Sequence, residues 1–175
     1  MDKKVLWITR TGVLVALLVA LQTAAALLSG RNQFITGSVV NMVLIVSVMT
    51  SGLATGLSVA AVSPIMATFL GIGPTWVLVP FIIVGNIILV TLWHVIGNRK
   101  KGGKYAAQIV ALVVAAAAKF IVIYLFVVQI AIPYIPNIPR QAAVIFSYPQ
   151  LITASIGGAL AIIALIPLRK AIKVN

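Results

Sequence analysis

One lysine stands in the middle of a long apolar stretch of this 175-residue sequence. Lys119 lies within residues 113–126, whose other members are all apolar except Tyr124. If residues 105–132 form one helix, the ammonium group is roughly 20 Å from either end, too far for the side chain to reach the lipid headgroups. An ionisable residue at that depth costs a few kcal/mol and must be satisfied inside the protein. Lys119 is therefore the first candidate for binding a ligand.

The sequence offers Lys119 no carboxylate partner, because its single acidic residue is Asp2 at the N-terminal end. Asn86 lies at the midpoint of the apolar segment 76–96, which we expect to run antiparallel to segment 105–132 and so to bring Asn86 to the depth of Lys119. An amide beside an unpaired ammonium group could receive a carboxylate, an imide or a carbonyl-rich ring. The alternative is structural: Lys119 bonds to backbone carbonyls or water, and Asn86 links neighbouring helices.

Further polar and aromatic side chains are expected near the outer ends of the helices. Aromatic residues at this depth often anchor a protein at the membrane interface, and polar loops are often only solvated. Together with the deeper pair, however, they outline an outward-opening pocket, and arginines at its mouth would raise the local concentration of an anion. The candidates are Arg31, Gln33 and Phe34 in the first outer loop, Asn41 one turn into the second helix, and Trp76, Arg140, Tyr148 and Gln150.

Composition identifies the chain as an all-α membrane protein. Hydrophobic residues make up 62% of it, charged residues only 8%, and the mean hydropathy is +1.20, values outside the range of soluble domains. The net charge of +12 comes from short basic clusters between apolar segments, which is typical of cytoplasmic loops and needs no nucleic-acid partner. With no cysteine, one histidine and one acidic residue, we expect no metal site, no cofactor and no catalytic triad.

Six apolar segments predict six transmembrane helices in a single domain spanning residues 1–175. Glycines and hydroxyl residues between 49 and 56 permit a tight reversal, and Pro133, Pro136 and Pro139 predict an extended linker. Pro149 either kinks the last helix or sets its first turn. The expected helices are residues 5–28, 37–53, 57–70, 76–96, 105–132 and 142–166.

The basic residues predict that both termini are cytoplasmic, because an even number of crossings places all three basic clusters on one side. The expected outer loops then contain only Arg31 and Arg140. The clusters are Lys3, Lys4 and Arg10, then Arg99, Lys100, Lys101 and Lys104, then Arg169, Lys170 and Lys173.

Small residues recur at four-residue spacing along the first helix. Gly12, Ala16, Ala20 and Ala24 form one stripe, which in lipid lets another helix approach closely. The partner could be another helix of this chain or another subunit. Because the sequence contains no Walker-type nucleotide-binding motif, the chain is not expected to be an enzyme, and uphill transport would need energy from a partner.

These features resemble the substrate-binding S component of energy-coupling factor (ECF) transporters. Ala16-x-x-x-Ala20-x-x-x-Ala24 is similar to the alanine motif on the first helix of that family. Residues 33–41, residues 80–86 and the pair Lys119-Phe120, with Leu125 nearby, resemble the branch assigned to pantothenate. The resemblance covers essentially the whole chain.

The resemblance implies a high-affinity vitamin-binding subunit in the bacterial plasma membrane, docked through its first three helices on a transmembrane coupling protein and two ATPases. Pantothenate, with one carboxylate, an amide and two hydroxyls, matches Lys119 or Arg31 together with Asn86, Asn41 and Gln150. Cobalamin and riboflavin are the alternative vitamins: the many amides of cobalamin would suit a polar outer mouth, whereas few aromatic residues are available to stack the flat ring of riboflavin. Two further interpretations are a stand-alone anion carrier and a membrane scaffold.

Overall fold

The computed structural model describes residues 2–30, 32–99 and 104–173, and within these ranges every regular element is helical. The elements follow one another without a strand in the described part of the chain, which confirms the all-α prediction. They are α1 (Lys3–Leu28), α2 (Gln33–Ser51), α3 (Leu53–Phe69), η1 (Trp76–Leu78), α4 (Val79–Gly97), α5 (Lys104–Ile123), the π-helical η2 (Tyr124–Ala131), α6 (Ile132–Tyr134), α7 (Gln141–Ile145) and α8 (Tyr148–Lys173).

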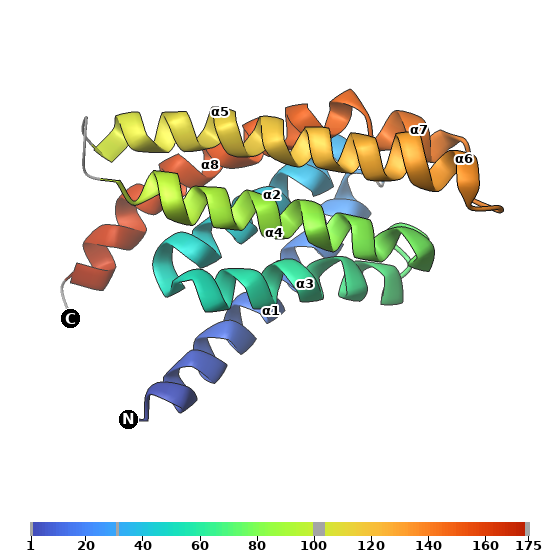
Figure 1. The fold of residues 1–175 in the computed structure, drawn as a ribbon. Helices are drawn as coiled ribbons and strands as arrows, with labels where there is room; N and C mark the ends of the chain where they lie inside the picture. The colour runs from blue at the N-terminus through green and yellow to red at the C-terminus, as the bar shows by residue number, and fades with distance from the viewer. Residues whose placement is uncertain (1, 31, 100–103, 174–175) are drawn as a thin grey trace.

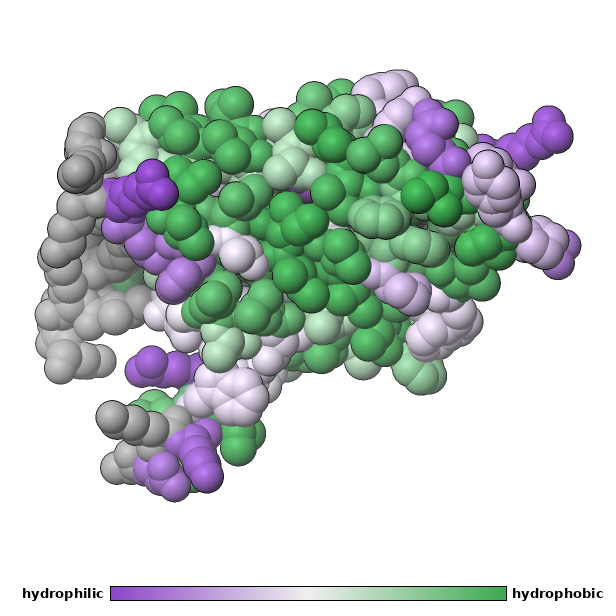
Figure 2. Space-filling model, viewed as in Figure 1, coloured by the Kyte–Doolittle hydropathy of each residue, from purple (hydrophilic) through white to green (hydrophobic). Residues whose placement is uncertain are grey.

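Five helical segments are long and apolar enough to cross a bilayer: Lys4–Leu28, Gln33–Ser51, Trp76–Gly97, Tyr105–Tyr134 and Gln141–Leu168. The sixth apolar helix, α3, has 17 residues, so at 1.5 Å per residue it spans about 25 Å of a hydrocarbon core of about 30 Å. Figure 2 shows a hydrophobic belt between two hydrophilic ends on the visible face. The structure therefore has five helices with the length and composition of membrane spans, and a sixth crossing by α3 stays a prediction.

The helices form one bundle in which α2 packs mainly against α8, and α4 packs against α5 and α3. Helix α1 crosses the bundle obliquely, as Figure 1 shows, and contacts α2 and α3. The start of α1, the end of α4 and the end of α8 lie at the same end of the bundle, and α6 and α7 lie at the opposite end. The start of α1 and the end of α8 therefore lie at the same end of the bundle, whereas six crossings and the cytoplasmic side of both termini stay predictions.

The exposed arginines and lysines described by the structure lie toward the two ends of the bundle. Lys4, Arg10 and Arg99 are exposed near the end that carries the termini, whereas Arg140 is exposed beside α7 at the other end. Arg31, Lys100 and Lys101 lie outside the described residues.

Two predicted boundaries in the first half of the chain are wrong by four residues. Helix α2 begins at Gln33 and not at residue 37, because the Asn32 side chain caps it by accepting a hydrogen bond of 2.9 Å from the backbone N–H of Phe34. Gln33 and Phe34 are thus in the first turn of a helix and not in a loop. Helix α3 begins at Leu53, because Gly52 alone makes the reversal, with φ at +86°.

The second half of the chain also departs from the predicted boundaries. The helical segment that holds Lys119 continues past Pro133 as far as Tyr134, where an extended linker was predicted. Before α6, the eight residues of η2 form a π-helix, in which hydrogen bonds join residues five apart and the turn is wider than in an α-helix. The expected last helix is two helices, α7 and α8, interrupted at Phe146 and Ser147. Pro149 is in the first turn of α8, where its missing N–H leaves no hydrogen bond unmade.

Helices α2 and α8 approach closely at Gly157. A Cβ atom built on Gly157 would lie 2.6 Å from the carbonyl oxygen of Ser38 and 2.6 Å from the Cβ of Asn41, both in α2. Backbone atoms cannot move aside as a flexible side chain does, so a larger residue must push the two helices apart. The absence of a side chain at Gly157 therefore allows α8 to pack directly against α2 next to Asn41.

We predict that Gly157→Ala destabilises the protein by roughly 1–3 kcal/mol, because overpacking forces the backbone of α2 away from α8. Gly12→Ala is the matched control, since nothing lies within 4 Å of a Cβ built at that helical position. Alanine is the better helix former, so the control should be neutral or slightly stabilising. Thermal unfolding of both purified variants measures the difference, and equal melting temperatures would contradict the close approach.

Candidate functional site

The side chain of Lys119 is held inside the bundle by two amide oxygens. Its Nζ donates to Oδ1 of Asn41 at 2.6 Å and to Oδ1 of Asn86 at 2.7 Å, and only 3% of the residue is exposed. These are short, charge-assisted hydrogen bonds, each worth roughly 1.5–3 kcal/mol. The predicted proximity of Lys119 and Asn86 is confirmed, and Asn41 is a second partner at the same depth.

Three further contacts hold the two asparagines in place. Asn86 donates through Nδ2 to the carbonyl oxygen of Ala60 in α3, at 3.3 Å. Asn41 donates through Nδ2 to the hydroxyl of Thr153 in α8 at 3.5 Å, and Thr153 donates to the carbonyl of Gln150. The network joins α2, α3, α4, α5 and α8, so each helix around the lysine contributes to its position.

The ammonium group is held by neutral dipoles alone. Asp2, the only acid in the chain, caps α1 by accepting a hydrogen bond from the backbone N–H of Lys4, far from this site. An ammonium group has three N–H donors, and two are used within the part of the chain that the structure describes. Lys119 therefore has one N–H donor left over, and no described side chain supplies a negative charge to it. No group of three His, Asp or Glu side chains that could hold a metal ion occurs among the described residues.

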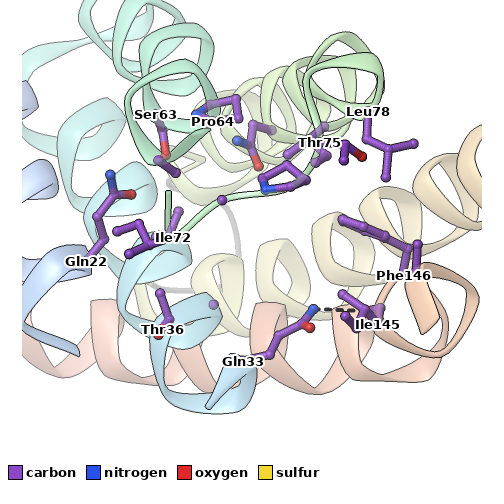
Figure 3. A pocket seen from close by; sticks show the side chains of 18 of the residues that line it. Gln22, Gln33, Thr36, Ser63, Pro64, Ile72, Thr75, Leu78, Ile145 and Phe146 are labelled. Atoms are coloured by element: carbon purple, nitrogen blue, oxygen red, sulfur yellow. Dashed lines mark hydrogen bonds between the residues drawn. The ribbon is translucent and has the colours of Figure 1, made fainter. Parts of the chain in front are cut away.

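A cavity of about 460 Å³ adjoins this network, within the range of small-molecule sites. Residues of α1, α2, α3, α4, α5 and α7 line it, together with the segment 72–78. It lies toward the end of the bundle opposite the termini, which the basic residues predict to be the outer end. Figure 3 shows Gln22, Ser63 and Ile72 on one side of it and Leu78, Ile145 and Phe146 on the other.

Four of the ten predicted ligand-binding residues line this cavity: Lys119, Asn86, Asn41 and Gln33. Gln33 donates through Nε2 to the carbonyl of Ile145 at 2.9 Å, the dashed line in Figure 3, and so joins α2 to α7.

Five other predicted residues do not line the cavity. Trp76 packs edge-on against Phe69, with ring centroids 4.9 Å apart, and is half exposed. Gln150 is buried, and its amide bonds to the carbonyl of Ile145. Three more are exposed side chains that the pocket does not include: Phe34, Arg140 and Tyr148. The tenth, Arg31, lies outside the described residues.

Several polar residues of the cavity wall were not among the predicted site residues. Gln22, Thr36 and Ser63 line it from α1, α2 and α3, and Thr75 and Gln141 line it from segments near the outer end. Gln22 could have been predicted from the sequence, because a glutamine within an apolar helix, like Lys119, needs a hydrogen-bonding partner inside the protein.

The small-residue stripe of α1 points away from the bundle. Gly12, Ala16, Ala20 and Ala24 are all exposed, whereas Leu18, Gln22 and Ala26 on the same helix are buried. Within residues 2–30, 32–99 and 104–173 the stripe is therefore on the outer surface of the bundle and not in its core.

The site combines one cationic group, neutral hydrogen-bonding groups and apolar walls in a space for a small ligand. Comparisons with protein-family models, with curated proteins and with solved structures find no match. The chemistry of the site therefore rests on its own residues, which suit the reversible binding of a small molecule that carries a negative or strongly polar group.

We predict a strong energetic coupling between Lys119 and Asn86 in the ligand-free protein. Asn86→Leu should lower the free energy of unfolding by roughly 1.5–3 kcal/mol, because it removes a charge-assisted hydrogen bond and leaves the Lys119 amine with one partner fewer. In the background of Lys119→Met the same change should cost much less, which gives a coupling energy of similar size. Unfolding of the four proteins in a denaturing detergent measures the cycle.

Ser47→Ala supplies the control for this cycle, because the buried Ser47 hydroxyl donates to its own helix at Val43 and not to Lys119. The changes in unfolding free energy caused by Ser47→Ala and by Lys119→Met should add in the double variant to within roughly 0.5 kcal/mol. If Asn86→Leu and Lys119→Met were also additive, the hydrogen bond would not hold the lysine.

Proposed function

We propose that this chain is the vitamin-binding subunit of an ATP-driven importer of the energy-coupling factor type, and that its vitamin is pantothenate. The observation that carries the proposal is the position of Lys119: a buried ammonium on the cavity wall, held by two neutral amides, with no acid nearby to neutralise it. Burying an unneutralised charge at mid-membrane is costly, and the cost is offset when an anionic ligand binds.

The shape and lining of the cavity favour a small, flexible acid. Its volume of about 460 Å³ suits a drug-sized ligand and is too small for a corrinoid, which argues against cobalamin. Phe146 is the one aromatic residue among the described lining residues, so a flat ring system such as riboflavin would find little to stack on. Pantothenate offers a carboxylate for Lys119 and an amide for Asn41 and Asn86.

The exposed small residues of α1 favour docking of this chain on another membrane protein, which would supply the energy for transport. Gly12, Ala16, Ala20 and Ala24 give a flat surface on the outside of the bundle, where close packing can drive association with another membrane helix. In our proposal this surface docks on a transmembrane coupling protein that carries two ATPases, in the bacterial plasma membrane. The chain then binds its vitamin without ATP and moves it only within the complex.

We predict that the purified chain binds pantothenate saturably in detergent without ATP, and that Lys119→Met weakens binding roughly 10- to 100-fold. The physical reason is the loss of a charge-assisted hydrogen bond of about 1.5–3 kcal/mol. Titration calorimetry measures the affinity, and a ligand-induced rise in melting temperature gives an independent check.

Lys4→Met is the control for the loss of a lysine, because Lys4 is exposed near the N-terminus, and it should bind as the unchanged protein does. The chain reconstituted alone in liposomes should take up no pantothenate. Equal affinities of Lys119→Met and Lys4→Met would contradict the role of the lysine, and uptake by the chain alone would identify a stand-alone carrier.

A further inference from the structure

A proline lies inside α3, one helical turn beyond the carbonyl group that holds Asn86. Pro64 is buried in this helix and lines the cavity, beside which Figure 3 shows it. Proline has no backbone N–H, so the carbonyl oxygen of Ala60, four residues earlier, lacks the hydrogen bond that an α-helix would give it. Ala60 has no exposed surface, so this oxygen needs a partner inside the protein.

Asn86 supplies that partner from the neighbouring helix α4. Its Nδ2 donates to the carbonyl oxygen of Ala60 at 3.3 Å. In membrane helices, backbone groups that a proline frees are satisfied by neighbouring helices in this way. The proline ring also crowds the carbonyl four residues earlier and tilts it out of the line of the helix, where a side chain of another helix can reach it. Pro64 thus makes the Ala60 carbonyl a free and accessible acceptor.

The two partners of Asn86 permit one orientation of its amide group. A backbone carbonyl can only accept a hydrogen bond, and the ammonium group of a protonated lysine can only donate one. Nδ2 of Asn86 must therefore face Ala60, and Oδ1 must face Lys119, which it meets at 2.7 Å. An amide turned the other way would direct its N–H groups at the lysine. The Ala60 carbonyl therefore selects the orientation that gives Lys119 its acceptor.

The other amide that holds Lys119 has a less selective anchor. Nδ2 of Asn41 lies 3.5 Å from the hydroxyl of Thr153, which itself donates to the carbonyl of Gln150. A hydroxyl can rotate and can donate as well as accept, so it does not distinguish the two ends of an amide as a carbonyl does. The orientation of Asn86 is therefore the better defined of the two.

We infer that Pro64 is a positioning residue of the ligand site. By withholding an N–H from the carbonyl of Ala60, it gives Asn86 a backbone anchor and so directs Oδ1 of Asn86 at Lys119. Pro64 acts through Asn86 and needs no contact with the ligand. The inference deepens the proposed function, on which its consequence for affinity rests, whereas the anchoring of Asn86 is a property of the ligand-free protein.

The ligand-free protein tests the anchoring. Pro64→Ala restores the missing N–H and improves the helix, but Asn86 must then share or lose its acceptor. In Asn86→Leu there is no amide to lose. Pro64→Ala should therefore raise the melting temperature roughly 2–4 °C more in the Asn86→Leu background than in the unchanged protein. Thermal unfolding of the four purified proteins in detergent measures this difference.

Pro167→Ala is the matched control. Pro167 also lies inside a helix, α8, but it is exposed and does not line the cavity. Its replacement should change the melting temperature by the same amount in both backgrounds, because it shares no partner with Asn86.

Pantothenate binding separates a positioning role from a merely structural one. Pro64→Ala should weaken binding roughly three- to tenfold, because Lys119 loses a fixed acceptor. In the Asn86→Leu background the same change should alter the affinity less than about twofold, because no amide is left to position. Pro167→Ala should leave the affinity unchanged. Calorimetry on the purified full chain gives these affinities.

Three results would overturn the inference and leave the proposed function intact. The first is an equal shift in melting temperature when Pro64→Ala is made in the two backgrounds. The second is an unchanged pantothenate affinity in Pro64→Ala, which would mean that Asn86 keeps its orientation without the proline. The third is an equal loss of affinity in both backgrounds, which would make the role of Pro64 structural. If the unchanged protein bound no pantothenate, the proposed function would fail, and the melting temperatures alone would decide whether Pro64 anchors Asn86.

Discussion

The structure depends on one buried lysine amine in an apolar bundle, with no carboxylate beside it. Lys119 is satisfied by the oxygens of Asn41 and Asn86 at 2.6 and 2.7 Å, and the amide groups of these residues are held in turn by Thr153 and by the backbone of α3. A lysine in lipid-spanning sequence is tolerated only when such groups replace its hydration shell. The amide dipoles add no negative charge of their own, which is why we propose that an anionic ligand completes the site.

The surrounding helices are arranged to keep that small network rigid. Gly157 lets α8 approach α2 beneath Asn41, so the amide cannot drift from the ammonium. Helix α1 lines the cavity with Gln22 and Ala26 and exposes Gly12, Ala16, Ala20 and Ala24 on its outer face. A division of this kind, with one face for ligand and the other for a partner, suits a protein whose cargo and energy source are different molecules.

The sequence predicted the helical class and the meeting of Lys119 with Asn86, because burial cost and antiparallel order are readable without coordinates. Asn41 was predicted to lie near the mouth of the pocket, because the helix cap at Asn32 was not recognised. With α2 beginning at Gln33 and not at residue 37, Asn41 lies about 6 Å further along the helix from its start.

The sequence could not determine how each helix is rotated. A helix that is apolar on all sides has no polar face from which its rotation about its own axis can be predicted. For this reason Phe34, Trp76 and Tyr148 were assigned to the pocket, although they lie outside its lining. For the same reason Gln22, which does line it, was not predicted.

Solid-state NMR on the bilayer-embedded protein tests the central claim most directly. With lysine side chains labelled at ¹⁵Nζ and pantothenate labelled at its carboxylate ¹³C, dipolar dephasing reports the distance between the two atoms. We expect the ligand carboxylate to dephase one lysine signal, which is absent in Lys119→Met, with a separation between the two atoms on the order of 3–4 Å. A bound ligand whose carboxylate dephases no lysine, or dephases one that persists in Lys119→Met, would contradict it.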